Sequence, residues 1–245
     1  MNKIWVIARK DISETFRSRS TWFIILIMII LAFTYISGYE SHIKTLTNQQ
    51  DVNAYSGGFL NSLAYVLPIM YSIFICSAFA NYAVIVDKAK RNIENLMATP
   101  VSIKQIWLGK SLAVTIPSIM VGYIVAILVY LAMAIILVMP KTHAFIFPSI
   151  LAIVSALIIV PTLIFSIVCI VTYIQLIITN PRIASFVFSG IFIILLFGVN
   201  ALGGFGISLN YFAWIYLGIA GICAAISYFL SFSLTKEKVL LSSKM

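Results

Sequence analysis

Stretches without a charged residue alternate with short charged segments along this chain. In chain order the uncharged stretches are 20–39, 52–86, 111–140, 142–181 and 183–235. A helix that crosses a bilayer needs about 20 predominantly apolar residues. Each of the first three stretches therefore predicts one membrane-spanning helix. The last predicts two, because a segment rich in glycine and asparagine, 200–210, interrupts it.

The stretch 142–181 has room for one helix or two, and the basic residues decide between these alternatives. With one helix the chain has six spans, both termini lie on one side, and that side carries every basic residue except Lys44 and Lys141. Such an excess of basic residues is typical of a cytoplasmic face, whereas a seventh span would export the basic C-terminal segment. We therefore predict six spans, at about 21–39, 60–86, 111–138, 148–178, 183–202 and 211–234.

The segment that precedes the first span has the pattern of an amphipathic helix. Its apolar residues recur at helical spacing, and its charged residues fall away from them. The apolar set is Trp5, Ala8, Ile12 and Phe16. We predict an interfacial helix over 3–19, with a merely solvated basic leader as the alternative. No small-residue cleavage site follows the first span, so we do not expect a signal peptide.

Composition places the chain among integral membrane proteins. It is 62% hydrophobic and 9% charged, with a mean hydropathy of +1.09, whereas soluble domains carry about 25% charged residues. The predicted fold is all-α, with a single transmembrane domain over 1–245 and both termini cytoplasmic. The formal net charge of +9 is spread along one membrane face, where anionic lipid attracts it. We therefore expect contact with membrane lipid and no binding of nucleic acid.

The sequence contains little that could support catalysis or metal binding. Its three cysteines lie in apolar runs without a CxxC spacing, and it has only two histidines. The motifs of phosphate-binding loops, serine hydrolases and zinc proteases do not occur. We expect no catalytic residue, no metal site and no cofactor bound by this chain.

The charged segment 87–110 contains the clearest local signals. Thr99 and Pro100 end one helix, since the residue before proline avoids the α region. Ser102 and Gln105 form a capping-box pattern, so a new helix begins there and continues into the third span. The segment is thus predicted to be a short helical elbow.

The elbow presents apolar residues beside an acid. Ile93, Leu96 and Met97 lie next to Glu94, and exposed apolar residues ringed by charge are typical of a protein docking surface. A solvated turn whose apolar residues lie against lipid is the alternative.

This segment resembles the loop between spans two and three of ABC-2 type permeases, the membrane subunits of one class of ATP-binding-cassette exporters. The positions that match the family pattern are Asp87, Glu94, Leu96, Thr99, Pro100, Val101, Ser102, Gly109 and Lys110. Asn92 and Ile93 replace the usual Gly-Thr. More weakly, ARKDISETFRSRS is similar to the family's amphipathic elbow helix, and TNPRIASFVFSGIFI to the start of its fifth span.

The resemblance implies an exporter permease whose loop is a coupling helix seated in a groove of a separate cytoplasmic ATPase. The residues implied in ATPase coupling are Asp87, Ile93, Glu94, Leu96, Met97, Thr99, Pro100 and Ser102. Two ATPase copies, which bind ATP and magnesium, and a second permease copy or a similar permease are the implied partners, in the cell membrane of a prokaryote. The connection between spans five and six is shorter than in many relatives, so their external gate is not implied in full. The chain also has no large extracytoplasmic domain, unlike the macrolide-efflux and lipoprotein-release types.

Polar residues within the spans are candidates for the transport pathway or for interhelical hydrogen bonds. They are Tyr65, Tyr71, Ser72, Asn81, Gln175, Ser189 and Asn200. No acidic residue lies within a predicted span, which disfavours a cation-coupled carrier. A membrane anchor or immunity-type protein that binds a partner without transporting a substrate is the alternative function.

Overall fold

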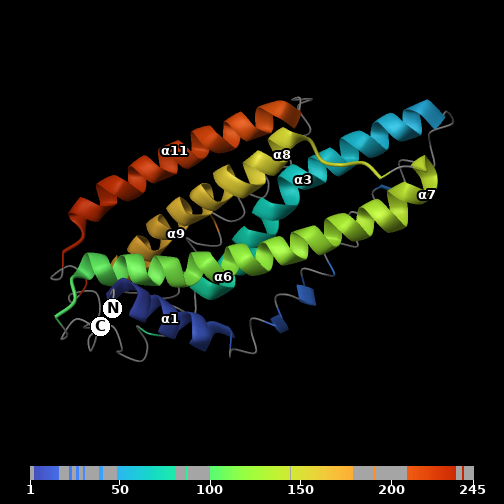
Figure 1. The fold of residues 1–245 in the computed structure, drawn as a ribbon. Helices are drawn as coiled ribbons and strands as arrows, with labels where there is room; N and C mark the ends of the chain where they lie inside the picture. Colours follow the sequence, from blue (N-terminus) through green and yellow to red (C-terminus); the bar gives the residue numbers. More distant parts are fainter. Residues whose placement is uncertain are drawn as a thin grey trace.

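In the computed structural model, the described part of the chain is a bundle of long helices (Figure 1). It comprises residues 3–16, 22–23, 26–27, 30, 39–40, 49–80, 87, 100–143, 145–178, 190, 209–235 and 239. Regular structure in these residues is entirely helical. The principal helices are α1 (Lys3–Phe16), α3 (Gln49–Ala80), α6 (Ile103–Ala132), α7 (Met139–Thr142), α8 (Ile150–Val154), α9 (Val160–Ile177) and α11 (Leu209–Ser233).

Four helical stretches in the described residues are long and apolar enough to cross a membrane. They are Gln50–Ser77, Ile103–Thr142, Ile150–Ile177 and Tyr211–Ser233. They correspond to the predicted second, third, fourth and sixth spans, although α3 begins at Gln49, well before the predicted boundary of 60. The predicted first and fifth spans, 21–39 and 183–202, lie almost entirely outside the described residues. That the chain has six spans, and that both termini lie on the cytoplasmic side, therefore remain predictions.

Two of the long helices contain a π-helical turn shortly before a proline. These turns are η2 (Met133–Val138), followed by Pro140, and η3 (Ser155–Ile159), followed by Pro161. Proline has no N–H to donate to the carbonyl four residues earlier, and that carbonyl lies inside the π-helix in both cases. A π-turn pairs a carbonyl with the N–H five residues later, which bypasses the proline. Both helical runs therefore continue past their prolines.

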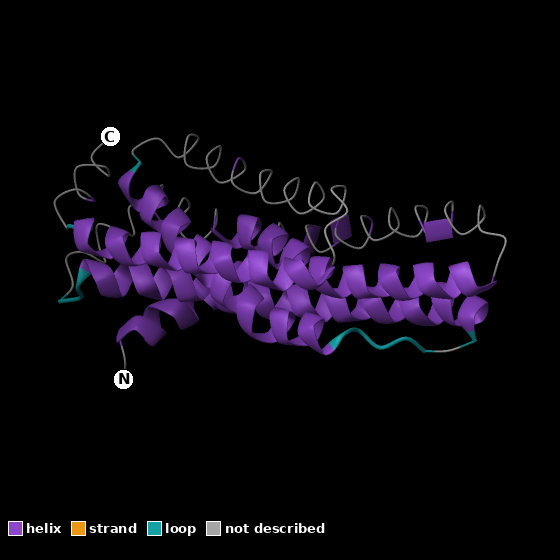
Figure 2. Ribbon diagram, turned by 90° about the horizontal axis from the view of Figure 1, so that it is seen from above, coloured by secondary structure: helices purple, strands orange, loops and turns teal. Residues whose placement is uncertain are grey.

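The bundle is built on α6, which packs against α1, α3 and α9, while α11 packs on α9. The start of α6 and the ends of α9 and α11 lie together at one end of the bundle, where α1 also packs (Figure 1). The connection 145–149 links α7 to α8 near the other end (Figure 2). It is tied to two helices, because the Ser149 N–H donates to Asn61 Oδ1 at 3.0 Å and the Tyr130 hydroxyl donates to the Ile146 carbonyl.

The crossing of α3 and α6 depends on a glycine. A Cβ placed on Gly122 would lie 2.7 Å from the Cα and 2.8 Å from the backbone nitrogen of Ser72. No L-residue other than glycine fits this approach without moving the backbone of one helix. By contrast, a Cβ placed on Gly218 or Gly221 of α11 meets nothing within 4 Å.

We expect Gly122→Ala to lower the unfolding temperature, because it pushes α3 and α6 apart. Overpacking of this kind typically costs about 1–3 kcal/mol. Gly218→Ala is the matched control and should be neutral or slightly stabilising, since alanine favours a helix by up to about 1 kcal/mol over glycine. Thermal unfolding in detergent, followed by tryptophan fluorescence, compares the two variants. Equal unfolding temperatures would contradict the close crossing.

Candidate functional site

The helix α1 packs on the beginning of α6 through one face. The buried residues of this face are Ile7, Ala8, Asp11 and Thr15. Trp5 and Phe16, which recur with Ala8 at helical spacing in the sequence, are 49% and 39% exposed, whereas Ala8 is fully buried. The helix thus has one face that contacts α6 and a second surface with exposed apolar side chains, which suits the predicted helix in the membrane interface.

Gly109 permits the close approach of α1 to α6. A Cβ at this position would lie 3.1 Å from the Cβ of Ile7 and 3.2 Å from the carbonyl oxygen of Ile4. Such contacts are tighter than ordinary van der Waals distance, so the two backbones meet here because glycine has no side chain. One turn further along α1, this approach brings Asp11 to the residue that follows the glycine, Lys110.

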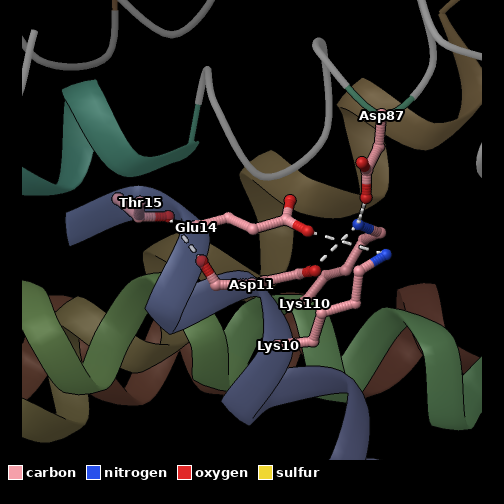
Figure 3. A network of polar contacts seen from close by, with 6 residues as sticks. All are labelled: Lys10, Asp11, Glu14, Thr15, Asp87 and Lys110. Atoms are coloured by element: carbon pink, nitrogen blue, oxygen red, sulfur yellow. Dashed lines mark hydrogen bonds and ion pairs between the residues drawn. The ribbon is translucent and has the colours of Figure 1, made fainter. Parts of the chain in front are cut away.

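Lys110 joins three segments of the chain (Figure 3). Its Nζ donates to Asp11 Oδ2 at 3.0 Å and to Asp87 Oδ2 at 2.5 Å. The Lys110 side chain is fully buried, and both aspartates are only 5% exposed. Buried charges are tolerated only when they are paired and hydrogen-bonded. The three residues, here called the Lys110 triad, therefore stabilise one another.

The charge state of Asp11 depends on its neighbour. Burial raises the pKa of the Asp11 carboxyl above its ordinary value, and the ammonium of Lys110 opposes that rise. The nearby exposed pair of Lys10 and Glu14, at 3.8 Å, has about half of each side chain in contact with solvent. Exposed pairs contribute little to stability, so the Lys110 triad is the energetically important part of this network.

Residues 88–99, the part of the predicted coupling loop between Asp87 and Pro100, are here called the 88–99 segment, and the residue that follows them is held as well. Lys3 Nζ donates to the carbonyl oxygen of Pro100 at 2.9 Å. Ser102 caps α6 as predicted: its hydroxyl accepts from the Gln105 N–H, and its own N–H donates to Gln105 Oε1 at 3.1 Å. The segment is thus attached to α1 and α6 at both of its ends, through Asp87 and through Pro100.

The structure describes only part of the predicted coupling set. Pro100 and Ser102 are exposed, as a contact surface requires, whereas Asp87 is buried. Asp87 therefore holds the base of the segment and has almost no surface to present to a partner. The residues of the predicted elbow that lie outside the described part are Ile93, Glu94, Leu96, Met97 and Thr99.

Sequence reasoning missed the importance of Asp11, Lys3 and Lys110. At the level of sequence, Lys110 stands only as a matching position of the family pattern, and Asp11 is not singled out. The signal was available in part, because Asp11 is spaced like Ile7 and Thr15 along one helical face. The partner of that face could not be read from the sequence, since Lys110 lies about a hundred residues away.

The polar residues predicted for the pathway are buried where the structure describes them. Tyr65, Tyr71, Ser72 and Gln175 lie in the core, and Asn81, Ser189 and Asn200 lie outside the described residues. The hydroxyls of Tyr65 and Ser72 have no hydrogen-bond partner within the described residues. Interhelical hydrogen bonds join other pairs instead, namely Ser111 with Thr172 at 2.7 Å and Trp107 Nε1 with the Cys169 carbonyl at 2.9 Å.

A pocket of about 230 Å³ lies between α3, α6 and the α8–η3 turn. Its lining is apolar and includes Leu67, Ala126 and Ala152. Tyr123 also lines the pocket, and its hydroxyl donates a hydrogen bond to the Ala156 carbonyl. Among the described residues predicted for the pathway, namely Tyr65, Tyr71, Ser72 and Gln175, none lines this pocket.

Comparison with known proteins supplies the family. No curated protein matches the chain. The family described as ABC-2 family transporter protein matches residues 5–239, nearly the whole chain. The match includes all of α1 except its first two residues, the Lys110 triad and the four described spans. Proteins of this family are membrane transport subunits that are not themselves catalytic. This chain belongs to the ABC-2 family of transporter membrane proteins.

Proposed function

We propose that this chain is the permease subunit of an ATP-driven exporter, coupled to a separate cytoplasmic ATPase through the loop 87–110, which contains the 88–99 segment. The family match supports a role in transport. The attachment of the segment at both ends is the observation that carries the coupling role. Asp87 is bound to buried Lys110 at one end, and Pro100 is bound to Lys3 at the other.

The physical requirement for coupling is that force on a loop must reach a membrane span. A loop with loose ends would bend when a partner pushes on it. Here the C-terminal end leads through the Ser102 cap directly into a helical run from Ile103 to Thr142, long enough to cross a bilayer. The N-terminal end is bound to the same run through Lys110. A force that the partner applies to the segment is therefore transmitted to α6.

The partners follow from the same proposal. The chain has no phosphate-binding loop, so ATP and magnesium bind in the partner, of which two copies are expected. A second permease copy, or a similar permease, completes the pathway in the cell membrane of a prokaryote. Membrane lipid surrounds the apolar outer surface, on which side chains such as Ile136, Trp214 and Phe229 are exposed.

We expect an affinity-tagged chain, purified from its native membranes in mild detergent, to retain an ATPase subunit. The captured complex should hydrolyse ATP, and the permease expressed alone should not. Mass spectrometry identifies the partner, and reconstituted vesicles test whether transport depends on ATP. Retention of some other partner, with no ATP hydrolysis, would support the membrane anchor or immunity-type alternative instead.

A further inference from the structure

We propose that the Lys110 triad joins α1, the base of the 88–99 segment and the first turns of α6 into one rigid unit, so that α1 moves with the coupling segment during transport. The inference rests on the proposed function and adds a moving part to it. Under this proposal Lys110 and Asp11 are positioning residues, which act on the partner only through the segment that they hold.

The attachment of α1 is repeated over three successive turns. Lys3 binds the Pro100 carbonyl, Ile7 packs on Gly109, and Asp11 binds Lys110. These positions are four residues apart and so lie on one face of the helix. Three attachments along one face fix both the position of α1 along α6 and its rotation, which a single contact could not do.

The chemistry of the attachments disfavours sliding. A shift of α1 by one turn would carry Asp11 away from the buried ammonium of Lys110 and Lys3 away from Pro100. Separated charges in a buried site lose their stabilisation without regaining water. The tight contact at Gly109 adds a steric limit, because the neighbouring positions on α6 carry side chains. The helices α1 and α6 therefore have one favourable arrangement.

The outward surface of α1 gives this unit a consequence in the membrane. Trp5 and Val6 are exposed and lie on the side of the helix away from Ile7, where they suit the boundary between headgroups and acyl chains. If α1 moves with the coupling segment, these side chains move through that boundary in each cycle. The unit is then driven by the ATPase on one side and resisted by lipid on the other.

The test is a disulfide that locks α1 to α6. Ile7→Cys with Gly109→Cys places two Cβ atoms 3.1 Å apart, a few tenths of an ångström closer than the roughly 3.5–4.5 Å of a disulfide, in a chain whose three native cysteines have been replaced. The oxidised protein should retain the ATP-dependent transport of its reduced form, because the two helices do not move relative to each other. A loss of transport on oxidation that a reductant reverses would overturn the proposal, and so would failure of the pair to cross-link.

The complementary test loosens the unit. Lys3→Met with Asp11→Asn should leave the captured ATPase and its hydrolysis in place but lower transport per ATP hydrolysed several-fold, and Asp11→Glu should restore part of it. An unchanged ratio of transport to hydrolysis would contradict the proposal. If the unaltered chain captures no ATPase at all, the proposed function fails instead, so the two failures are distinguishable.

Discussion

Lys110→Met is expected to lower the free energy of unfolding by about 3–5 kcal/mol, the usual cost of removing one partner from a buried ion pair. The substitution keeps the length of the side chain but takes the ammonium away from two buried carboxylates, those of Asp11 and Asp87. Such a loss is a large part of the stability of a typical domain. The variant should therefore unfold at a clearly lower temperature or accumulate poorly in the membrane.

Lys10→Met is the matched control, because Lys10 is a lysine of the same network whose side chain is 55% exposed. Its pair with Glu14 should be worth at most about 1 kcal/mol. Thermal unfolding of both variants in detergent, beside the unaltered chain, measures the difference. If the two variants unfold at the same temperature, the triad is not a stabilising unit.

The pH dependence of this deficit gives a second measurement on the same variants. Burial raises the pKa of the Asp11 carboxyl, and Lys110 opposes the rise, so removal of Lys110 should raise the pKa further. For a carboxyl whose pKa is higher in the folded than in the unfolded state, the contribution to stability is present at low pH and is lost as the pH rises through the folded-state pKa. The deficit of Lys110→Met should accordingly shrink from neutral toward mildly acidic pH.

The elements that the sequence predicted well are those set by local patterns. Four spans follow from the length of the uncharged stretches, and the start of α6 follows from the Ser102 capping box. The details that it missed depend on residues far apart in the chain. The rotation of α1 is set by the absence of a side chain at Gly109, and amphipathic spacing alone cannot reveal which of two apolar faces meets a neighbouring helix.

The candidate site likewise has one part that could be predicted from local sequence and one part that could not. Its contact surface was predicted from residues adjacent in sequence, around Glu94 and Pro100. The Lys110 triad beneath that surface depends on three segments that meet only in the fold. Asp11 comes from α1, Asp87 follows the second predicted span, and Lys110 comes from α6. A lone acid in an amphipathic helix has no partner until the fold supplies one. Tyr65 and Ser72 are candidates for the pathway or for interhelical hydrogen bonds, and their hydroxyls have no partner within the described residues. An interhelical hydrogen bond joins Ser111 and Thr172, a pair that the sequence could not indicate because it depends on the rotation of two helices.

The second large effect is expected within the 88–99 segment. The triple variant Glu94→Lys, Leu96→Ala and Met97→Ala reverses the charge that would set register and removes the apolar contact. Interface anchors typically cost more than about 1 kcal/mol each when truncated, and a few reach about 2 kcal/mol. The loss of two such anchors weakens binding more than about tenfold. The variant should therefore insert and accumulate normally, yet lose the captured ATPase or ATP-dependent transport.

The structure makes this outcome informative, because the residues that hold the segment lie outside the substituted set. Asp87 and Pro100 keep their bonds to Lys110 and Lys3, so the change should act on the contact surface and leave the base intact. Asn95→Ala is the control within the same segment. Substitutions on a solvated turn usually stay within about 0.5 kcal/mol, and an unchanged melting temperature in the triple variant separates lost contact from lost fold. A triple variant that keeps both capture and transport at the unaltered level would mean that force reaches α6 by some other surface.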